Sequence, residues 1–504
     1  MPEGKRSSPE LIAVATVFLL ALGSRLAYIG IYGYMFDDAY ITFRFARNIV
    51  DGVGFAYNAG ESVYGASSPL YTLIVALLSA VLSPGTLPSV ARWLGLIGLL
   101  TSAFLLYRYL PLTPLARLVM LIGLLSYPRI YYSSTGGMEE CFIFFLMALS
   151  VVALARSSPV LLGLAVGLLF VTKVDTVIWT GCLLLIALLR RQRSLGVSLG
   201  LAAAVALPWI IYSFVEFGSI LPHTIEAKQV AYTHWRGFRF MDALLLAVPD
   251  GLRNQPVMVL LFVSFWYGVL GHSLWRMISS RDLLFLPFPL YCVAYTLALF
   301  FSGTAVGLWT RWTVPLLGCL VVCFGYLVQW WVTNVKRFGK DSLGRVGGIV
   351  LTVAAAVSML IPILYPNREA LTLVSHREAG DWLRQQASPG ESIMLEPIGY
   401  IGYVSGLYVH DFIGLVSHEI TERRLDGGFS DRWFARYLKD YRPTYVMLRV
   451  EELRMNDFIY GGYGDGIFTP DERAWFDAEY QSVLRTDVGP SKDWFEIFRL
   501  VSAR

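Results

Sequence analysis

Two adjacent carboxylates, Asp37 and Asp38, follow the first apolar run of the sequence. A carboxylate that lies beside a sugar acceptor can act as a general base: it takes the proton of the attacking hydroxyl and contributes roughly 10²- to 10⁴-fold to the rate. Aspartate is also a preferred capping residue at the start of a helix, and two carboxylates together could instead hold a divalent cation. The pair therefore indicates base catalysis, helix capping or metal binding.

The residues after this pair have the spacing of a short amphipathic helix. Ile41, Phe45 and Ile49 share one helical face, and Arg44 and Arg47 lie on another. A helix of this kind, directly after an apolar run, is typical of a segment that lies in the membrane interface. We therefore expect the two carboxylates to lie at a membrane surface.

Two further charged clusters occupy the ends of apolar runs. Glu139 and Glu140 begin one run, where acids can complement the helix dipole, and Glu139 is also a candidate for binding substrate. Lys173 and Asp175 stand in a tight turn between two short runs. An unpaired charge in hydrocarbon costs about 2.5 to 3.5 kcal/mol, so a structural ion pair is the alternative to a role in binding.

A fourth segment, residues 218–239, combines cations with aromatic residues. It contains His223, Lys228 and Arg239, and Arg311 stands between two tryptophans further along the chain. Aromatic and cationic side chains often only anchor a protein among lipid headgroups. The functional alternative is that Lys228 and an arginine bind a lipid phosphate, because guanidinium groups match phosphate geometry.

The composition indicates that the chain is a membrane protein. Hydrophobic residues make up 56% of the 504 residues and charged residues only 15%, whereas soluble domains carry about 25% charged residues. Apolar runs recur from residue 11 to residue 364 and are long enough to cross a bilayer. The net charge of +4 is small for this length, and the basic residues cluster in short loops, so nothing indicates nucleic-acid binding.

The cysteines indicate neither a disulfide framework nor a zinc site. All five lie inside apolar runs, where they pack most simply as small hydrophobic residues; they are Cys141, Cys182, Cys292, Cys319 and Cys323.

The basic loops predict the topology, because positively charged loops tend to stay in the cytoplasm. If residues 11–32 cross outward, Arg108 and Arg117 are cytoplasmic only if one of the runs 69–82 and 90–107 does not cross. The shorter run has the length of an interfacial or re-entrant segment, which leaves about eleven spans. The predicted spans are 11–32, 90–107, 115–131, 140–155, 159–172, 176–190, 195–215, 255–275, 283–302, 313–333 and 346–364.

This topology predicts two domains, a membrane module of residues 1–365 and a tail of residues 366–504 outside the cytoplasm. The first outward loop, residues 33–89, belongs to the membrane module. The tail alternates helical and strand-like patterns, which is typical of a small α/β domain. The predicted helices are 376–387, 428–440 and 470–481. The predicted strands are 392–395, 444–448 and 495–498.

Together these residues resemble the GT-C class of integral-membrane glycosyltransferases, which use a polyprenyl-phosphate sugar donor outside the cytoplasm. The first outward loop is similar to that of the mycobacterial terminal arabinofuranosyltransferase family, at 37–48, Gly52, Gly54, Asn58, Gly60, Glu61, Tyr64 and Gly65. Further similar elements are 137–139, 222–224, 227–228, Arg311 with Pro315, 411–415 and 442–445.

The resemblance implies a GT-C-like fold in the cell membrane and an inverting transfer to an envelope glycan, lipid or protein. It implies a first-loop aspartate as base, carried here onto Asp37 with Asp38 beside it. Arg44, Glu139 and Tyr64 are the candidates for binding substrate. The candidates for binding the donor phosphate or sugar are Lys173, Asp175, His223, Lys228, Arg239 and Arg311.

Departures from the family pattern leave the sugar open. Lys173-Val174-Asp175 stands where relatives more often have Arg-Pro-Glu or Arg-Pro-Asp, and His223 replaces an asparagine. Two other classes of protein compete with the enzyme. A transporter or flippase of lipid-linked sugars would carry ionisable residues near mid-membrane, and a non-catalytic envelope scaffold would need no acid pair.

Cysteine labelling tests the predicted topology. A single cysteine introduced in loop 83–89 should react with an impermeant thiol reagent in intact cells, because this loop is predicted to face outward. One introduced in loop 108–114 should react only after the membrane is permeabilised. Labelling of the second loop in intact cells would contradict the assignment of 69–82 as a segment that does not cross.

Overall fold

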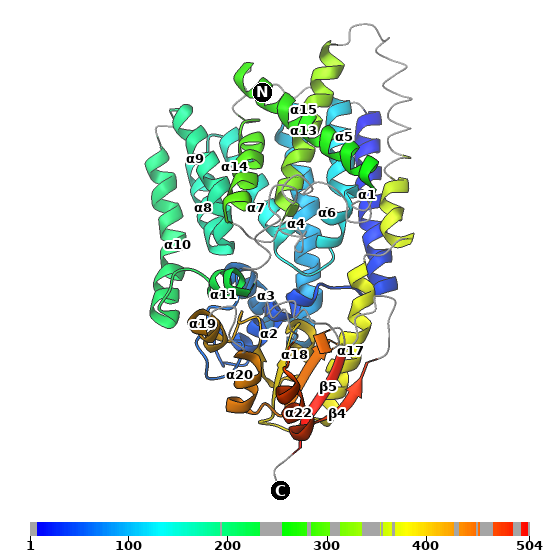
Figure 1. The fold of residues 1–504 in the computed structure, drawn as a ribbon. Coiled ribbons are helices and arrows are strands. Elements are labelled where there is room, and N and C mark those ends of the chain that lie inside the picture. Colours follow the sequence, from blue (N-terminus) through cyan, green and yellow to red (C-terminus); the bar gives the residue numbers. More distant parts are fainter. Residues whose placement is uncertain are drawn as a thin grey trace. The chain divides into compact units, whose positions relative to one another are not determined.

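The computed structural model describes residues 8–191, 194–231, 255–279, 284–302, 313–334, 353, 356–364, 368–427, 433–449, 452–453, 467–486 and 495–501. The chain divides into two compact units (Figure 1). The first, here called the helical unit, comprises Met1–Tyr34, Ala91–Pro208 and Phe238–Pro366. The second, here called the mixed unit, comprises Met35–Val90, Trp209–Gly237 and Asn367–Arg504.

Apolar helices build the helical unit. Among the described residues, five helices are long and apolar enough to cross a membrane, and they are α1 (Ser8–Tyr32), α4 (Leu87–Tyr109), α10 (Leu195–Phe217), α13 (Pro256–Ser279) and α15 (Val314–Asn334). Shorter helices of this unit are α5 (Pro114–Ser126), α6 (Pro128–Ser133), α7 (Glu140–Ala155), α8 (Pro159–Thr172), α9 (Val177–Leu189) and α14 (Pro287–Ser302).

Most of the predicted spans from 11–32 to 313–333 coincide with these helices, which confirms a polytopic α-helical membrane protein. The span predicted at 115–131 is instead divided between α5 and α6, because the helix is interrupted at Tyr127. For the last predicted span, 346–364, residues 346–352 lie outside the described residues and 356–364 are helical. Proline stands at the first position of several of the shorter helices, where its missing N–H costs no hydrogen bond.

Small residues allow the spans to approach closely. A Cβ on Gly163 of α8 would overlap the main chain of Ser198 in α10, and one on Gly98 of α4 would crowd the main chain of Cys141 in α7. Small residues at such contacts are the usual way in which membrane helices pack, because lipid supplies no hydrophobic drive between them.

A fully buried arginine fastens α1 to the segment before α7. Arg25 donates to the hydroxyl of Ser134 at 2.7 Å and to the carbonyl of Leu125 at 2.9 Å, and its guanidinium lies 4.3 Å from the ring centroid of Tyr131. A buried charge is tolerated only where polar groups surround it. This cation therefore fixes the chain that leads to Glu139.

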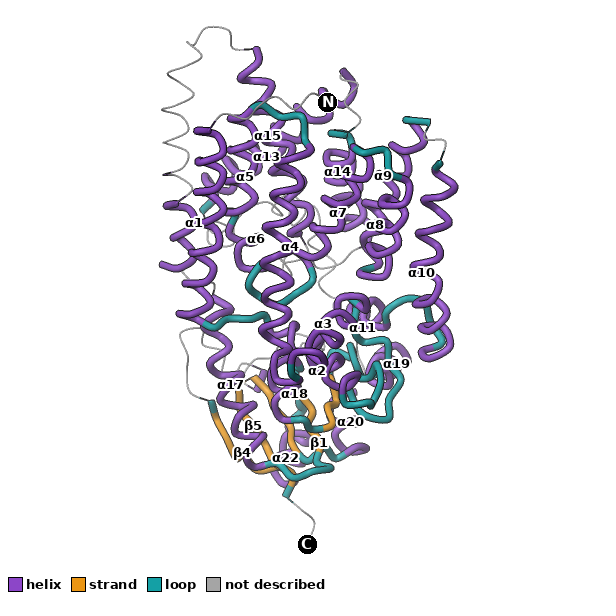
Figure 2. Tube along the Cα trace, turned by 180° about the vertical axis from the view of Figure 1, so that it is seen from behind, coloured by secondary structure: helices purple, strands orange, loops and turns teal. Residues whose placement is uncertain are grey.

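A five-stranded sheet forms the centre of the mixed unit, in the order β2-β1-β3-β5-β4. Its strands are β1 (Ser392–Leu395), β2 (Tyr408–Asp411), β3 (Tyr445–Arg449), β4 (Tyr480–Arg485) and β5 (Phe495–Leu500). The first three pair in parallel, and β5 pairs antiparallel with β3 and β4 (orange in Figure 2). Helices of the tail are α17 (Arg368–Gln386), α18 (Gly399–Ser405), α19 (His418–Gly427), α20 (Trp433–Tyr441) and α22 (Pro470–Glu479).

Most of the predicted tail elements are present. The strand predicted at 392–395 is β1, and those at 444–448 and 495–498 are within one or two residues of β3 and β5. The helix predicted at 470–481 ends at Glu479, because Tyr480 begins β4. Of the helix predicted at 428–440, residues 428–432 lie outside the described residues and the rest belongs to α20.

The mixed unit also contains segments that are distant in sequence from the tail. They include α2 (Asp37–Val50), α3 (Pro69–Leu82) and α11 (His223–Ala231). The run 69–82 is helix α3 as predicted, and Leu77 and Val81 on it are exposed to 65% and 75%. The predicted domain boundary between residues 365 and 366 stays a prediction. The mixed unit contains the first loop and α11 in addition to the tail.

Candidate functional site

Asp37 and Asp38 occupy the first turn of α2, but neither caps this helix. Phe36 precedes the helix, and no side-chain cap bond is present there. Instead, the carboxylate of Asp37 accepts hydrogen bonds from the main-chain N–H groups of Gly399 at 2.9 Å and Tyr400 at 2.8 Å. These two groups begin α18, so Asp37 caps a helix of the tail, where the helix dipole favours a negative charge.

The approach of α2 to α18 requires a glycine. A Cβ on Gly399 would lie under 3.0 Å from the main-chain oxygen of Asp37, a distance that real Cβ atoms essentially never show. Figures 1 and 2 show α2 and α18 side by side. Asp38 lies half-buried in the same turn of α2. The first loop and the tail thus meet at the acid pair.

Arg44, on the same helix, is buried and its donors are occupied. The guanidinium donates to the carbonyls of Tyr57 at 2.8 Å, Gly402 at 2.7 Å and Leu407 at 2.7 Å, and to the side-chain oxygen of Asn58 at 3.2 Å. Burial lowers the pKa of Arg44. In this conformation the side chain joins the first loop to the tail, and its role in binding substrate stays a prediction.

The arginines on the expected polar face of α2 are covered by the tail. Arg44 is 4% exposed, and Arg47 donates to the carbonyl of Tyr403 at 2.9 Å while its guanidinium lies 4.7 Å from that ring. Beneath Arg44, burial raises the pKa of Tyr57 to about 12, and its hydroxyl donates to the carbonyl of Ile398 at 2.6 Å. Helix α2 is therefore an internal element of the mixed unit, because the tail covers the face that the sequence presents as polar.

Tyr64 of the first loop lies in an aromatic cluster. Its hydroxyl accepts a hydrogen bond from the indole N–H of Trp209 at 2.9 Å, and its ring stacks on Phe217 with centroids 5.3 Å apart. The side chain is 3% exposed. Like Arg44, Tyr64 is held by protein contacts, and its contact with substrate stays a prediction.

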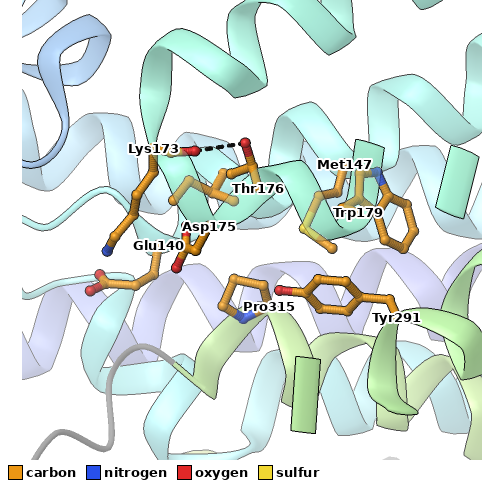
Figure 3. Close-up of a pocket in the computed structure, with 9 residues that line it drawn as sticks. Glu140, Met147, Lys173, Asp175, Thr176, Trp179, Tyr291 and Pro315 are labelled. Atoms are coloured by element: carbon orange, nitrogen blue, oxygen red, sulfur yellow. Dashed lines mark hydrogen bonds between the residues drawn. The ribbon is translucent and has the colours of Figure 1, made fainter. Parts of the chain in front are cut away.

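The candidates Glu139, Lys173 and Asp175 gather in the helical unit. The ammonium of Lys173 lies 2.7 Å from a carboxylate oxygen of Glu139, which forms no cap bond at the start of α7. Figure 3 shows Lys173 and Asp175 beside Glu140, at a small cavity that Tyr291 also lines. The cavity volume is ≈ 10 Å³, close to what a single water molecule requires. These charges form a closed internal network in this conformation.

His223 and Lys228 belong to α11 in the mixed unit. His223 Nε2 lies 3.1 Å from the hydroxyl of Thr421, and its Nδ1 lies 3.0 Å from Nδ1 of His418 on α19. Burial and the neighbouring His418 lower the pKa of His223. Lys228 is half-buried one turn further along the helix. The other two predicted cations, Arg239 and Arg311, lie outside the described residues.

Three side chains of the mixed unit could hold a metal ion. Ligand atoms of His223, Glu226 and His418 lie within 4.8 Å of one another, and His418 Nε2 also lies 3.1 Å from a carboxylate oxygen of Glu422. Two imidazoles with carboxylates suit Zn²⁺. The sequence prediction named His223 but missed His418 and Gly399, which have no motif of their own and are identified only by their contacts.

Comparisons with known proteins give the fold of the whole chain and a domain model for the tail. A family model described as a domain of unknown function, DUF8728, matches residues 365–498. No curated protein matches the sequence. The crystal structure of ArnT from Cupriavidus metallidurans bound to undecaprenyl phosphate is similar with a TM-score of 0.59 and 13% identity, over 98% of each chain. The apo structure of the same protein gives a TM-score of 0.61 and 12% identity, over 97% of each chain. The chain therefore has the fold of ArnT, a GT-C membrane protein, as predicted.

Substitution of Gly399 tests the contact between α2 and α18. Gly399→Ala should lower the unfolding temperature of the purified protein in detergent, because overpacking of this kind costs about 1–3 kcal/mol. Gly85→Ala is the matched control, since a Cβ there would meet nothing within 4 Å. Equal unfolding temperatures for the two variants would contradict the close approach of Asp37 to Gly399.

Zinc titration tests the cluster of His223, Glu226 and His418. Zn²⁺ should raise the unfolding temperature of metal-free protein, because a ligand that binds only the folded state stabilises it. His418→Ala should remove most of this rise, whereas His376→Ala, which changes a histidine outside the cluster, should retain it. A rise of the same size in the His418 variant would show that the cluster is not a zinc site.

Proposed function

We propose that this chain is an inverting glycosyltransferase that uses a polyprenyl-phosphate sugar and acts on the outer face of the cell membrane. The acceptor hydroxyl oxygen bonds to the anomeric carbon while the bond from that carbon to the phosphate oxygen breaks. The polyprenyl phosphate leaves, and a carboxylate of the protein takes the hydroxyl proton. The acceptor would be an envelope glycan, lipid or protein.

The observation that carries this proposal is the acid pair of α2, held against the tail by Asp37. A general base is effective only if its geometry is fixed before the substrate arrives. The fold adds support, because the similar ArnT structure was obtained with undecaprenyl phosphate bound. That compound has the chemistry of the leaving group in the proposed reaction.

Within the pair, we assign the base to Asp38 and an anchoring role to Asp37. Both oxygens of the Asp37 carboxylate accept main-chain hydrogen bonds from the start of α18. Asp37 therefore anchors α2 to the tail, and a proton transferred to either oxygen would compete with one of these bonds. Asp38 is the neighbouring carboxylate in the same turn and therefore the better candidate to take the proton.

The donor phosphate would be bound by cations. Lys228 on α11 is the described candidate in the mixed unit, and Arg239 and Arg311 are the further candidates from the sequence. Lys173 and Asp175 would contribute only after a rearrangement, since Lys173 pairs with Glu139 and the adjoining cavity is small. Such a rearrangement would expose charges that are now internal, and donor binding would have to supply its free energy.

An arabinofuranosyl donor is the finer proposal. Its support is the similarity of the first-loop sequence to the mycobacterial terminal arabinofuranosyltransferase family. The orientation proposed from the basic loops, with the N-terminus in the cytoplasm and the tail outside, puts the acid pair on the side where a polyprenyl-phosphate pentose would be used.

Transfer assays on purified protein in liposomes, with a panel of synthetic polyprenyl-phosphate sugars, test the reaction and the base together. Asp38→Asn should lower turnover about 10²- to 10⁴-fold while donor binding survives. Asp37→Asn should lower the unfolding temperature, because its amide group can accept only one of the two N–H bonds well. Asp51→Asn, which changes an exposed acid just after α2, is the control for charge.

Other results would overturn parts of the proposal. Loss of turnover in the Asp37 variant at an unchanged unfolding temperature would make Asp37 the base. Donor binding without turnover by the wild type, across all donors and acceptors, would favour a transporter of lipid-linked sugars or a scaffold.

A further inference from the structure

A series of aromatic rings lies at the surface of the mixed unit, where β2, α19 and α20 meet. We call it the aromatic strip; it consists of Tyr408, His410, Tyr437 and Tyr441. The ring centroids of Tyr408 and His410 are 4.8 Å apart, those of His410 and Tyr441 are 5.9 Å apart, and Tyr437 and Tyr441 stack at 4.3 Å. The strip is continuous, since each ring contacts the next.

The strip combines buried and exposed members. His410 and Tyr437 are buried, and a hydrogen bond of 2.8 Å joins His410 Nδ1 to the Tyr437 hydroxyl. Tyr408 and Tyr441 are 37% and 40% exposed. Burial lowers the pKa of His410 to about 4, so this ring is neutral near pH 7. The two exposed rings, Tyr408 and Tyr441, therefore pack against buried aromatic rings that carry no charge.

Charged side chains fix the exposed rings in place. The hydroxyl of Tyr408 donates to Glu61 of the first loop, and that of Tyr441 donates to Glu419 of α19. Arg423 donates to Glu419 at 3.2 Å, and its guanidinium lies 5.2 Å from the Tyr441 ring. Rings with restricted motion lose little entropy when a ligand binds. The surface is thus ordered in advance.

The chemistry of this surface matches that of a neutral glycan. A sugar ring presents C–H groups on its faces, which can contact aromatic rings, and hydroxyls at its edges, which can bind carboxylates and guanidinium. The carboxylates of Glu61, Glu419 and Asp440 outnumber the guanidinium of Arg423. This balance disfavours anionic ligands such as nucleic acids and phosphates. Arg423 pairs with both Glu419 and Asp440, which reduces the negative charge that a basic peptide would require.

We propose that the aromatic strip, with Glu61, Glu419 and Arg423, is a binding site for the glycan chain of the acceptor. The proposal rests on the proposed transferase function, which it extends from the reaction to the choice of acceptor. Glu61 lies in the first loop, which also carries Asp37 and Asp38, so the strip and the acid pair belong to one unit. A glycan bound to the strip would raise the local concentration of its own acceptor end at that unit.

Binding of short neutral oligosaccharides of pentose and hexose units to the full-length protein in detergent tests the site without any turnover. Tyr408→Ala and Tyr441→Ala should each weaken binding about three- to tenfold, as expected for the loss of one aromatic contact. Tyr441→Phe, which keeps the ring, should weaken it less. Val483→Ala on β4 is the control, because it changes another exposed residue of the same unit.

The unfolding temperature of each variant shows whether the substitution has disturbed the fold. If Tyr441→Ala, which removes a stacked ring, does not fold, the binding measured with Tyr408→Ala tests the site. Absence of oligosaccharide binding by the wild type, equal binding by the tyrosine and control variants, or tighter binding of a basic peptide would overturn the proposal.

Kinetics separate this proposal from the transferase function. The tyrosine variants should raise KM for long glycan acceptors about three- to tenfold and leave kcat with a monosaccharide acceptor unchanged. If the protein transfers no sugar but the variants still lose glycan binding, the site stands and the transferase function fails. If transfer occurs and binding is the same in all variants, the site alone fails.

Discussion

The mixed unit depends on satisfying one buried charge. Arg44 brings a guanidinium into an interior position, where an unpaired cation would cost several kcal/mol, and the structure meets this demand with carbonyls of two distant segments. Two of the acceptors, Gly402 and Leu407, are 358 and 363 residues away from Arg44 in the sequence. The tail therefore completes the hydrogen bonding of a charge that the first loop carries.

The same requirement explains why the acid pair has two different environments. Since α18 lies directly against α2, one carboxylate meets the start of that helix, and each of its oxygens accepts a main-chain hydrogen bond. The other carboxylate, one residue later, points in a different direction because successive residues of a helix are about 100° apart. The contacts of Asp37 thus depend on the position of a neighbouring helix. The glycine at that position is as necessary to these contacts as the acid is.

The sequence was sufficient for elements whose signal is local. The spans follow from apolar length, α3 from a short run that ends before Pro84, and β1 and β3 from compact apolar segments. Helix α18 was missed because Gly399 and Gly402 disfavour a helix, and only the contacts with Asp37 and Arg44 compensate. The contacts of Arg44 with the tail were not predicted for a related reason: its spacing from Ile41 and Phe45 suggests a solvated face, and no local pattern reveals that the tail covers it.

The assembly of the mixed unit from three separate stretches of chain has a consequence for biogenesis. Its first stretch leaves the ribosome early, whereas the last follows only after the helices from α4 to α15 have been made. Contacts of such large sequence separation form slowly, so the early stretch must wait through most of synthesis with its polar interior open. A nascent chain that stalls before the tail would present this unfinished surface to proteases and chaperones. Completion of the mixed unit thus requires that translation has continued as far as the tail.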